Sequence, residues 1–400
     1  MPPVAVLSVA ALLLAAPAPA GGFAGFDDFL GRLERAPTGA RAELTGRYVA
    51  WQRERGGFPV VEKDAVVFVY VGSANEKAVR VIGDFKLRHF NTVLWDASGE
   101  PLSAAGGVFW RRMRIEPDAR LQYQFLVDGK LVNDPLNPRT FVTGISPAAG
   151  KDPALASDLV MPGYHLRDLA RPRGARPGRT VPVEEAWANP KVTVHLPAGY
   201  DPARRYPVLY VADGGAWARF LGITTILDNL AADGSIEPVI AVLIDPTEDR
   251  SGWYNFRAPY LPYLEKVVTW VDAHYATRAT AAGRVHVGSS AGARATLAVV
   301  LERPDLFAGA GLFSPTITAP PSYFEPYITG RKRPDPRLRF WLSAGSYEGY
   351  VLEDARWLER YLRTTGIAVA ATYTHEAHSL AAYQNLAGDM LVFFFPGPKR

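Results

Sequence analysis

The sequence predicts two domains, an all-β sandwich followed by an α/β domain with a mostly parallel sheet. The chain has 400 residues, which exceeds the length of one average domain. Short strand-like runs separated by turn residues fill residues 59–160, whereas β-rich runs alternate with helical stretches after residue 183. The first pattern is typical of a β-sandwich, and the second is typical of a parallel sheet covered by helices on both faces.

The first twenty residues are similar to an export signal. They contain no charged side chain, and the run from Val4 to Ala16 is almost entirely apolar. This run is shorter than the roughly 20 residues that span a bilayer, and the small residues Ala18-Pro19-Ala20 follow it. We expect residues 1–20 to be a signal peptide and the protein to be secreted or periplasmic. A buried or membrane-anchoring helix is the alternative, because no Lys or Arg precedes the apolar run.

Residues 21–160 divide into a helical segment and a β domain. Apolar side chains recur at helical spacing from Phe26 to Leu33, so we expect helix in residues 21–58. Between Leu121 and Val127 every second residue is large and apolar, as in a strand with one buried face. We expect residues 59–160 to form a β-sandwich that shapes substrate selectivity, with a separate carbohydrate-binding module as the alternative.

A linker and the α/β domain complete the predicted organisation. Residues 163–182 carry five Arg and three Pro, so we expect residues 161–182 to be a linker. The α/β domain is expected over residues 183–400. Its β-rich runs lie at residues 191–196, 207–212, 238–244, 284–288, 338–344 and 367–375, and its helical stretches lie near residues 215–231, 258–275, 291–302, 351–365 and 379–395.

The composition excludes several classes of site. The chain has no cysteine, so it has no disulfide, no thiolate metal site and no cysteine nucleophile. The formal net charge is +4, and acidic and basic residues are mixed along the chain. A nucleic-acid-binding protein needs a concentrated basic face, so we expect no nucleic-acid partner.

A nucleophile motif stands between a β-rich run and a helical stretch. The run ends in Gly288-Ser289-Ser290-Ala291-Gly292, which has the pattern Gly-x-Ser-x-Gly. The glycines allow a tight turn that leaves the serine exposed at a helix N-terminus. We therefore predict that Ser290 is the nucleophile and that the Ala291 N–H stabilises an oxyanion, with an ordinary tight turn as the alternative.

A serine nucleophile needs a base, and the sequence offers two histidines downstream. His375 continues the apolar run at residues 368–373, whereas His378 lies in the loop that follows. We predict His378 as the base, with His375 or a surface histidine pair as alternatives. The two histidines are three residues apart, which is not the spacing of the zinc-binding helix motif, so no metal site is expected.

The acid should follow the preceding strand, because the order in such enzymes is serine, acid, histidine. The run Arg339 to Ala344 reads as that strand, and Glu348 follows it closely. We predict that Glu348 orients His378. Asp354 is the alternative, although it and Glu353 are placed to begin the next helix as ordinary first-turn acids.

Further candidates lie in loops expected at the carboxyl edge of the sheet, where ligands of open α/β sheets bind. Gly214 and Gly215 follow the run at residues 207–212 and are candidates for the second oxyanion donor. Aromatic and arginine side chains in these loops would suit an aromatic or anionic acyl group, and each has a structural role as its alternative. These candidates for substrate binding are Trp217, Arg250, Trp253, Tyr254, Arg257 and Arg294.

With these motifs the sequence resembles the enterochelin-esterase-like branch of the putative esterase family, the esterase D-like α/β hydrolases. In the first domain the resemblance rests mainly on Gly83-Asp84-Phe85, Tyr123-Gln124-Phe125 and Asp134-Pro135-Leu136-Asn137-Pro138. In the second it rests on Asp213-Gly214, Arg250 and the serine motif. The resemblance implies an immunoglobulin-like, early-set domain before an α/β-hydrolase domain. It also implies a serine carboxylic-ester hydrolase that acts on a small-molecule ester without a cofactor.

Two departures from siderophore esterases weaken the substrate assignment. The serine motif of those enzymes usually ends in a double glycine, but here Ala293 follows Gly292. Their histidine usually precedes Asp-Trp, but here Ser379-Leu380 follows His378. The alternatives are therefore a feruloyl or acetyl esterase acting on plant polysaccharide, an acyltransferase, and a non-catalytic protein that binds carbohydrate or siderophore.

Overall fold

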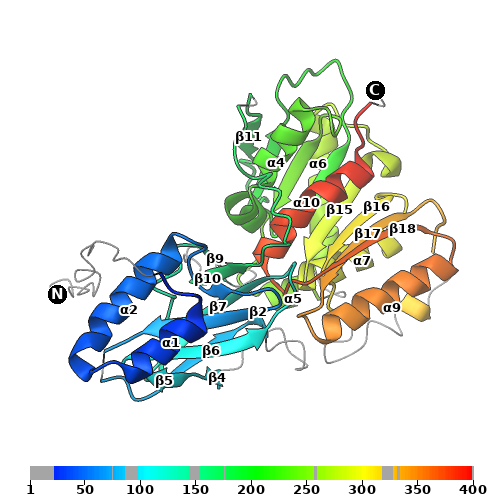
Figure 1. The fold of residues 1–400 in the computed structure, drawn as a ribbon. Helices are drawn as coiled ribbons and strands as arrows, with labels where there is room; N and C mark the ends of the chain where they lie inside the picture. Colours follow the sequence, from blue (N-terminus) through cyan, green and yellow to red (C-terminus); the bar gives the residue numbers. More distant parts are fainter. Residues whose placement is uncertain are drawn as a thin grey trace, which may run out of the picture. The chain divides into compact units, whose positions relative to one another are not determined.

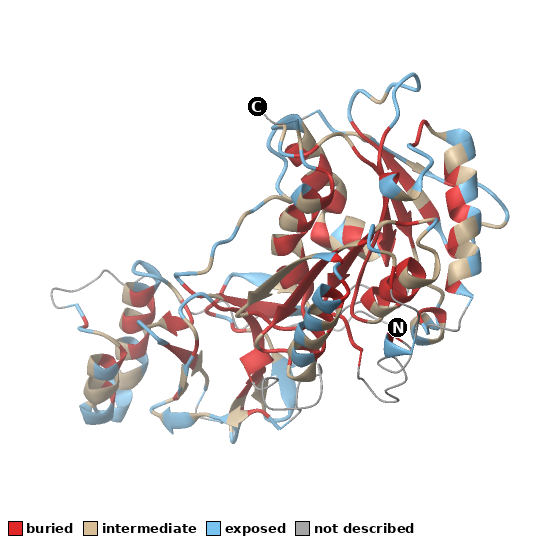
Figure 2. Cartoon of the chain, turned by 90° about the vertical axis from the view of Figure 1, so that its right-hand side faces the viewer, coloured by how far each residue is buried: buried red, intermediate tan, exposed pale blue. Residues whose placement is uncertain are grey.

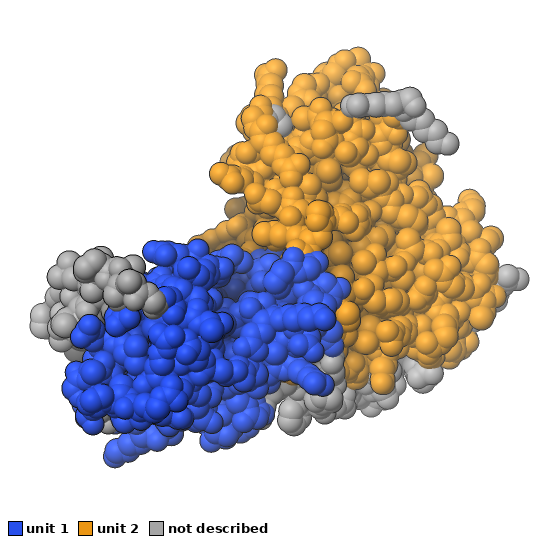
Figure 3. Space-filling model, viewed as in Figure 1, with its two compact units in different colours: residues 1–83, 96–140, 156–163 blue, residues 84–95, 141–155, 164–400 orange. Residues whose placement is uncertain are grey.

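The computed structural model describes residues 22–73, 75–85, 98–143, 154–174, 176–255, 259–317, 328–330 and 334–398. The predicted signal peptide and Arg257 lie outside these residues. The chain divides into two compact units (Figure 3). Unit 1 comprises residues 1–83, 96–140 and 156–163, and unit 2 comprises residues 84–95, 141–155 and 164–400.

Unit 1 contains two helices and two antiparallel sheets (Figure 1). Phe68 contacts Tyr123 at a ring-centroid distance of 4.8 Å, and these residues come from different sheets, so the sheets face each other. The elements are the helices α1 (Phe26–Arg35) and α2 (Thr38–Arg53), and one sheet of β1 (Val60–Val61), β2 (Ala65–Val71), β6 (Val108–Arg114) and β5 (Ser103–Ala105). The other sheet contains β4 (Glu100–Pro101), β3 (Val79–Gly83), β7 (Arg120–Val127) and β10 (Leu155–Val160), with β8 (Lys130–Val132) paired to β7. β9 (Thr140–Val142) pairs with β10, but only its first residue is assigned to unit 1.

The two helices of unit 1 pack on the four-stranded sheet through aromatic side chains. Phe29 of α1 stacks on Tyr48 of α2 with ring centroids 4.0 Å apart. Both rings belong to one buried cluster with Val67 and Val69 of β2. The helical spacing of apolar residues in the first segment therefore serves to cover one sheet of this unit.

Unit 2 contains an eight-stranded sheet in the order β11-β12-β14-β13-β15-β16-β17-β18. The neighbours from β14 through β18 are parallel, as predicted, and β12 joins them antiparallel. The strands are β11 (Arg179–Pro182), β12 (Val192–Leu196), β13 (Val208–Ala212), β14 (Ile240–Ile244), β15 (Arg284–Ser289), β16 (Gly309–Phe313), β17 (Arg339–Gly345) and β18 (Ala368–Thr374).

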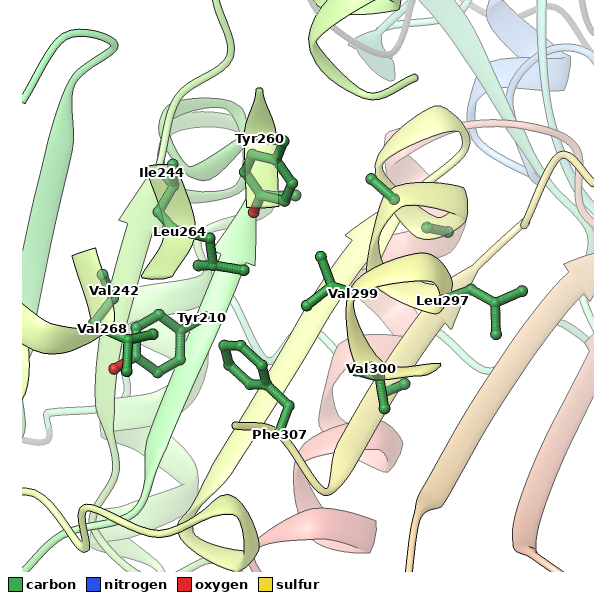
Figure 4. Packing of buried hydrophobic residues seen from close by; sticks show 14 of the residues in the cluster. Tyr210, Val242, Ile244, Tyr260, Leu264, Val268, Leu297, Val299, Val300 and Phe307 are labelled. Atoms are coloured by element: carbon green, nitrogen blue, oxygen red, sulfur yellow. The ribbon is translucent and has the colours of Figure 1, made fainter. Parts of the chain in front are cut away.

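Helices cover both faces of this sheet, since alternate residues of β13 enter different clusters. Tyr210 lies in one buried cluster with Leu264 of α6 and Val299 of α7 (Figure 4), whereas Leu209 lies in the cluster that contains Ile226 of α4 and Met390 of α10. The helices are α3 (Gly214–Ala216), the π-helix η3 (Trp217–Leu221), α4 (Ile223–Ala232), α5 (Arg250–Trp253), α6 (Tyr260–His274), the short η4 (Ala281–Gly283), α7 (Ala291–Glu302), α9 (Tyr350–Thr364) and α10 (Leu380–Phe394).

The burial pattern agrees with this layering. The six inner strands of the eight-stranded sheet are buried along most of their length, whereas the edge strands β11 and β18 are not (Figure 2). The helices α6 and α9 are buried on one side and exposed on the other, and α7 has no exposed residue. No helix among the described residues is long and apolar enough to cross a bilayer. The architecture of unit 2 is that of an α/β hydrolase.

The segment expected to be a linker is attached to unit 2. The Asn229 side-chain amide donates hydrogen bonds to the carbonyls of Leu169 and Arg171 at 2.8 and 2.9 Å, and Arg167 pairs with Asp389 of α10. Residues 179–182 form the edge strand β11. The Pro and Arg residues of this segment show no helical or strand periodicity in the sequence. In the structure, side chains of α4 and α10 make hydrogen bonds with its backbone groups.

The structure also contains a strand that the sequence did not indicate. β16 lies between β15 and β17 and contains Gly309 and Gly311. A Cβ atom on either glycine would lie 2.8 to 2.9 Å from a methyl group of Val285 or Val287. Glycine therefore lets β16 fit against β15, although it weakens the strand signal in the sequence.

Candidate active site

Loops from four neighbouring parallel strands meet at one edge of the unit 2 sheet. The register aligns Ser289 with Phe313 and Phe313 with Ser343, so β15, β16 and β17 end close together. β18 continues this series beside β17. The loops that follow these strands carry Ser290, Ser314, Glu348 and His378, which are far apart in the sequence.

Ser290 occupies a strained turn between β15 and α7. Its backbone has φ 58° and ψ −122°. Residues other than glycine rarely adopt this conformation, which typically costs about 1–3 kcal/mol. Its N–H donates to the Phe313 carbonyl at 2.9 Å, which holds the turn against β16. A Cβ atom on Gly288 would lie 2.5 Å from the Gly292 carbonyl, so the turn requires glycine there.

His378 and Glu348 form a buried pair. The distance between His378 Nδ1 and Glu348 Oε2 is 2.6 Å, and both side chains are almost completely buried. The other carboxylate oxygen, Oε1, accepts hydrogen bonds from Ser314 Oγ at 2.8 Å and from the Gly345 N–H at 2.6 Å. An ionised carboxylate only accepts hydrogen bonds, so His378 donates its Nδ1–H to Glu348.

The opposite nitrogen of the histidine is the one available for proton transfer. His378 Nε2 is buried and has no hydrogen-bond partner among the described residues. In the tautomer set by Glu348, Nε2 carries a lone pair. The pair therefore presents a base whose orientation is fixed from behind by a carboxylate.

The structure distinguishes between the alternatives that the sequence left open. Asp354 lies in α9, and its carboxylate accepts a hydrogen bond from the Ile317 N–H at 2.7 Å. His375 directly follows β18 and is half-buried, whereas His378 contacts Glu348. The described residues thus bring Glu348 to His378, and they place Asp354 against the loop after β16.

Sequence reasoning missed two residues that hold the acid. Ser314 has a positive φ of 49° and follows β16, the glycine-containing strand that the sequence pattern concealed. Gly345 ends β17, and a Cβ atom there would lie 1.9 Å from the Glu376 carbonyl oxygen. If β16 is recognised as a strand, Ser314 follows it at the same sheet edge as Ser290 and becomes a candidate site residue.

The candidate oxyanion donors differ in their availability. Ala291 is the first residue of α7, where backbone N–H groups have no partner within the helix. Gly214 is the first residue of α3, and a Cβ atom on it would lie 2.3 Å from the Ile244 backbone nitrogen. The Gly215 N–H already donates to Asp245 Oδ1 at 2.6 Å, which leaves Ala291 and Gly214 as the candidates.

Arg250 supports the serine turn through a buried ion pair. Its guanidinium makes two hydrogen bonds to the Asp213 carboxylate, at 2.7 and 2.8 Å, and lies 3.4 Å from the Ser289 carbonyl oxygen. Burial lowers the pKa of Arg250, but the charge and hydrogen bonds of Asp213 outweigh this effect, and the pKa is raised overall. Asp213 therefore neutralises the charge of Arg250.

The aromatic candidates lie in the core of unit 2, not on a surface of the site. Trp217 is the first residue of the π-helix η3. It is fully buried and contacts Phe313 at a ring-centroid distance of 5.1 Å. Trp253 packs against Tyr260 at 5.7 Å. The Tyr254 hydroxyl accepts a hydrogen bond from the Asp213 N–H at 2.8 Å. The predicted aromatic wall is thus not formed by these three side chains, and Arg294 is the remaining described candidate.

Comparison with known proteins identifies an esterase-like chain. Residues 185–361 match the model of the family described as putative esterase. An endo-1,4-beta-xylanase/feruloyl esterase of Xylanibacter ruminicola is 30% identical over an alignment of 136 positions, and the alignment covers 30% of this chain and 19% of that protein. This chain therefore covers only about a fifth of the length of that relative.

Solved structures of enterobactin esterases share the fold. The enterobactin esterase of Shigella flexneri, determined in the presence of enterobactin, has a TM-score of 0.68 and 17% identity over 86% of this chain and 97% of its own. The ferric enterobactin esterase of Salmonella typhimurium has a TM-score of 0.70 and 17% identity, with 86% and 98% covered. At this identity the comparison establishes the fold.

Proposed function

We propose that this chain, whose residues 185–361 match the putative esterase family, is a carboxylic-ester hydrolase with Ser290 as its nucleophile. The observation that carries the proposal is the buried contact of 2.6 Å between His378 and Glu348, with Nε2 of the histidine left without a partner among the described residues. The same sheet edge holds Ser290 in a strained turn at the start of α7. A serine, a base and an orienting acid in this chain order are the parts of an acyl-transfer site.

The proposed reaction has two halves. Ser290 Oγ attacks the ester carbonyl carbon while His378 Nε2 takes the hydroxyl proton, and Glu348 stabilises the resulting imidazolium. The N–H groups of Ala291 and Gly214 bind the oxyanion. The alcohol leaves with the proton from His378, and the acyl group remains on Ser290. Water then attacks the acyl-enzyme and gives a proton to Nε2. His378 passes this proton to Ser290 Oγ as the acyl–oxygen bond breaks, which releases the carboxylic acid and restores the free serine.

The proposed substrate is a small-molecule ester, and the names of similar proteins suggest two kinds of ester. A relative in sequence is named as a feruloyl esterase, and relatives in fold are named as enterobactin esterases. A feruloyl or acetyl ester and a siderophore ester are therefore the first compounds to test. An acyltransferase would use the same acyl-enzyme with an alcohol as acceptor in place of water, and a binding protein would use the fold without turnover.

Export and the role of the first domain belong to the same proposal. The apolar run from Val4 to Ala16 supports a signal peptide over residues 1–20 and a secreted or periplasmic location. The two facing antiparallel sheets of unit 1 support an immunoglobulin-like, early-set sandwich over residues 59–160. We assign this domain a role in substrate selectivity, with residues 183–400 as the catalytic domain.

The test is a substrate panel combined with labelling of the serine. The purified chain is assayed with aryl acetate, acetyl, feruloyl and trilactone esters, and products are compared with water alone and with an added alcohol acceptor. A fluorophosphonate should modify Ser290, which mass spectrometry of the digested protein locates. Transfer to the alcohol in preference to water would identify an acyltransferase, and a folded protein that neither turns over nor reacts with the probe would be a binding protein.

Replacement of the nucleophile gives a direct prediction. We expect Ser290→Ala to lower kcat by on the order of 10³-fold or more, since only oxyanion stabilisation and binding remain. The far-ultraviolet circular dichroism spectrum should stay unchanged, because the Ser290 side chain makes no capping hydrogen bond to α7. Turnover near the wild-type rate in the folded variant would show that Ser290 is not the nucleophile.

A further inference from the structure

An arginine lies one helical turn beyond the proposed nucleophile. Arg294 is the fourth residue of α7, and its backbone N–H donates to the Ser290 carbonyl at 3.1 Å. Arg294 therefore lies in the first turn of α7, four residues after Ser290. The Arg294 side chain is half-buried. It is therefore held close to the sheet edge at which the reaction is proposed to occur.

The Arg294 guanidinium has no partner within the part of the chain that the structure describes. It makes no hydrogen bond or ion pair there. By contrast, Arg250 is paired with Asp213, and Glu348 is held by His378, Ser314 and Gly345. A partly buried cation without an anion is unfavourable, because it has lost water without gaining a partner. Such a group is stabilised when an anionic ligand arrives.

The electrostatic surroundings agree with this geometry. Burial lowers the pKa of Arg294, the Tyr350 hydroxyl group opposes this shift, and the positive charge of Arg250 adds to it. Tyr350 begins α9, just after the loop that carries Glu348, and Arg250 belongs to the ion pair with Asp213. The first turn of α7 also favours negative charge, because its backbone N–H groups point out of the helix end.

We propose that Arg294 binds a carboxylate of the substrate, and that the enzyme prefers esters with such a charge a few bonds from the scissile carbonyl. This inference rests on the proposed function and specifies its substrate class. The guanidinium is planar and donates two parallel hydrogen bonds, which match the two oxygens of a carboxylate. A neutral ester leaves the guanidinium without a partner in the complex. We therefore expect a neutral ester to bind more weakly than an ester with a carboxylate.

The test compares esters that differ only in charge. On the acyl side the pair is para-nitrophenyl pentanoate and the mono-para-nitrophenyl ester of glutarate. On the alcohol side the pair is methyl para-acetoxybenzoate and para-acetoxybenzoate. The quantity measured is the ratio of kcat/KM for the anionic ester to kcat/KM for its neutral partner, in the wild type and in Arg294→Gln. We expect this ratio to fall by about 10-fold to 100-fold in the variant for at least one pair, because a charge-assisted hydrogen bond is lost.

Two further variants separate local binding from long-range attraction. Arg294→Lys keeps the charge without the planar fork and should restore part of the ratio. Arg360→Gln removes an exposed arginine of α9 and changes the net charge by the same amount, so its ratio should stay that of the wild type. An equal fall in Arg360→Gln would show a long-range effect of net charge and overturn the proposal.

Inhibition gives a readout that does not depend on a folded Gln variant. Glutarate should inhibit wild-type hydrolysis of the neutral pentanoate ester competitively, and more weakly in Arg294→Lys. An unchanged ratio in folded Arg294→Gln, or inhibition that is equal in the wild type and Arg294→Lys, overturns the carboxylate assignment while the esterase proposal stands. A folded wild type that hydrolyses none of the four esters contradicts the proposed function itself, and this inference with it.

Discussion

At the scale of single residues, the role that we propose for Glu348 is exerted only through His378. Its carboxylate contacts His378 Nδ1 at 2.6 Å and is held from the other side by Ser314 and Gly345. Removal of its charge leaves the nucleophile and the oxyanion donors in place. An orienting acid therefore contributes less to the rate than the nucleophile whose reaction it supports.

We predict that Glu348→Gln lowers kcat/KM strongly, but roughly 10-fold to 100-fold less than Ser290→Ala does. Gln can donate to Nδ1 and thereby favour the wrong histidine tautomer. Steady-state kinetics with a small aryl ester measures both losses. Asp354→Asn is the matched control, because Asp354 is a buried carboxylate that binds the Ile317 N–H. If Asp354→Asn were the more impaired variant, Glu348 would not be the acid.

At the scale of elements, Gly345 lets the loops after β17 and β18 cross closely. A Cβ atom there would lie 1.9 Å from the Glu376 carbonyl oxygen, and these loops carry Glu348 and His378. We predict that Gly345→Ala lowers kcat at least about tenfold and reduces the free energy of unfolding by about 1–3 kcal/mol, as overpacking does. Activity assays and urea unfolding measure these effects.

Gly39→Ala provides the matched control for this substitution. Gly39 lies in α2, and a Cβ atom there would meet no other atom within 4 Å. Ala is favoured over Gly in a helix by about 0.5–1 kcal/mol, so this variant should be slightly more stable and fully active. An equal loss of activity in both variants would show that the close crossing of the two loops is unimportant.

Another element-scale prediction concerns a buried carboxyl group in unit 1. Burial raises the pKa of Asp134 to about 6, against the lowering effects of the hydrogen bonds from Tyr123 and the Leu136 and Asn137 backbone. The folded state therefore holds this proton at a pH at which the unfolded chain, with its ordinary pKa of 3.8, has lost it. The contribution of Asp134 to stability falls as pH rises from about 4 to about 6.

We predict that Asp134→Asn gains stability relative to the wild type over that range of pH. Asn has nearly the same shape as Asp and carries no charge at any pH in this range. The difference in unfolding free energy between variant and wild type should shift in favour of the variant by about 3 kcal/mol between pH 4 and pH 7. Thermal unfolding at a series of pH values measures the shift. A difference that does not change with pH would mean that Asp134 titrates normally in the folded protein.

At the scale of the whole molecule, we propose that unit 2 performs the chemistry and that unit 1 shapes selectivity. Every residue of the proposed reaction lies in unit 2, and the segment from residue 164 to residue 182 is attached to that unit. We predict that a chain of residues 164–400 still hydrolyses a small aryl acetate, while its selectivity among bulky esters changes. The measurement is kcat/KM for both kinds of ester in the truncated and the full chain.

The alternative for unit 1 gives a different result in the same experiment. If unit 1 is a separate carbohydrate-binding module, a folded truncated chain keeps the selectivity of the full chain, and residues 22–163 bind glucan in an affinity gel. Circular dichroism verifies that the truncated chain is folded. A change in selectivity without glucan binding supports the role that we propose for unit 1.

The sequence by itself determined the features that depend on neighbouring residues. Alternation of β-rich and helical stretches after residue 183 predicted the parallel sheet, and Gly288-Ser289-Ser290-Ala291-Gly292 predicted a tight turn before a helix. Strand order then predicted that the loops bearing Glu348 and His378 would lie at the same edge as Ser290. These inferences succeed because periodicity and turn chemistry act over a few residues, and because parallel strands end at one edge.

Only the tertiary structure decided which partner each side chain has. It placed Trp217 in the core, engaged the Gly215 N–H with Asp245, and held Glu348 with Ser314 from a strand that two glycines concealed. It also paired Arg250 with Asp213 and left Arg294 without a partner among the described residues. These outcomes depend on contacts between segments that are tens to hundreds of residues apart. Local sequence patterns carry no information about such contacts, because packing selects them only when the whole chain has folded.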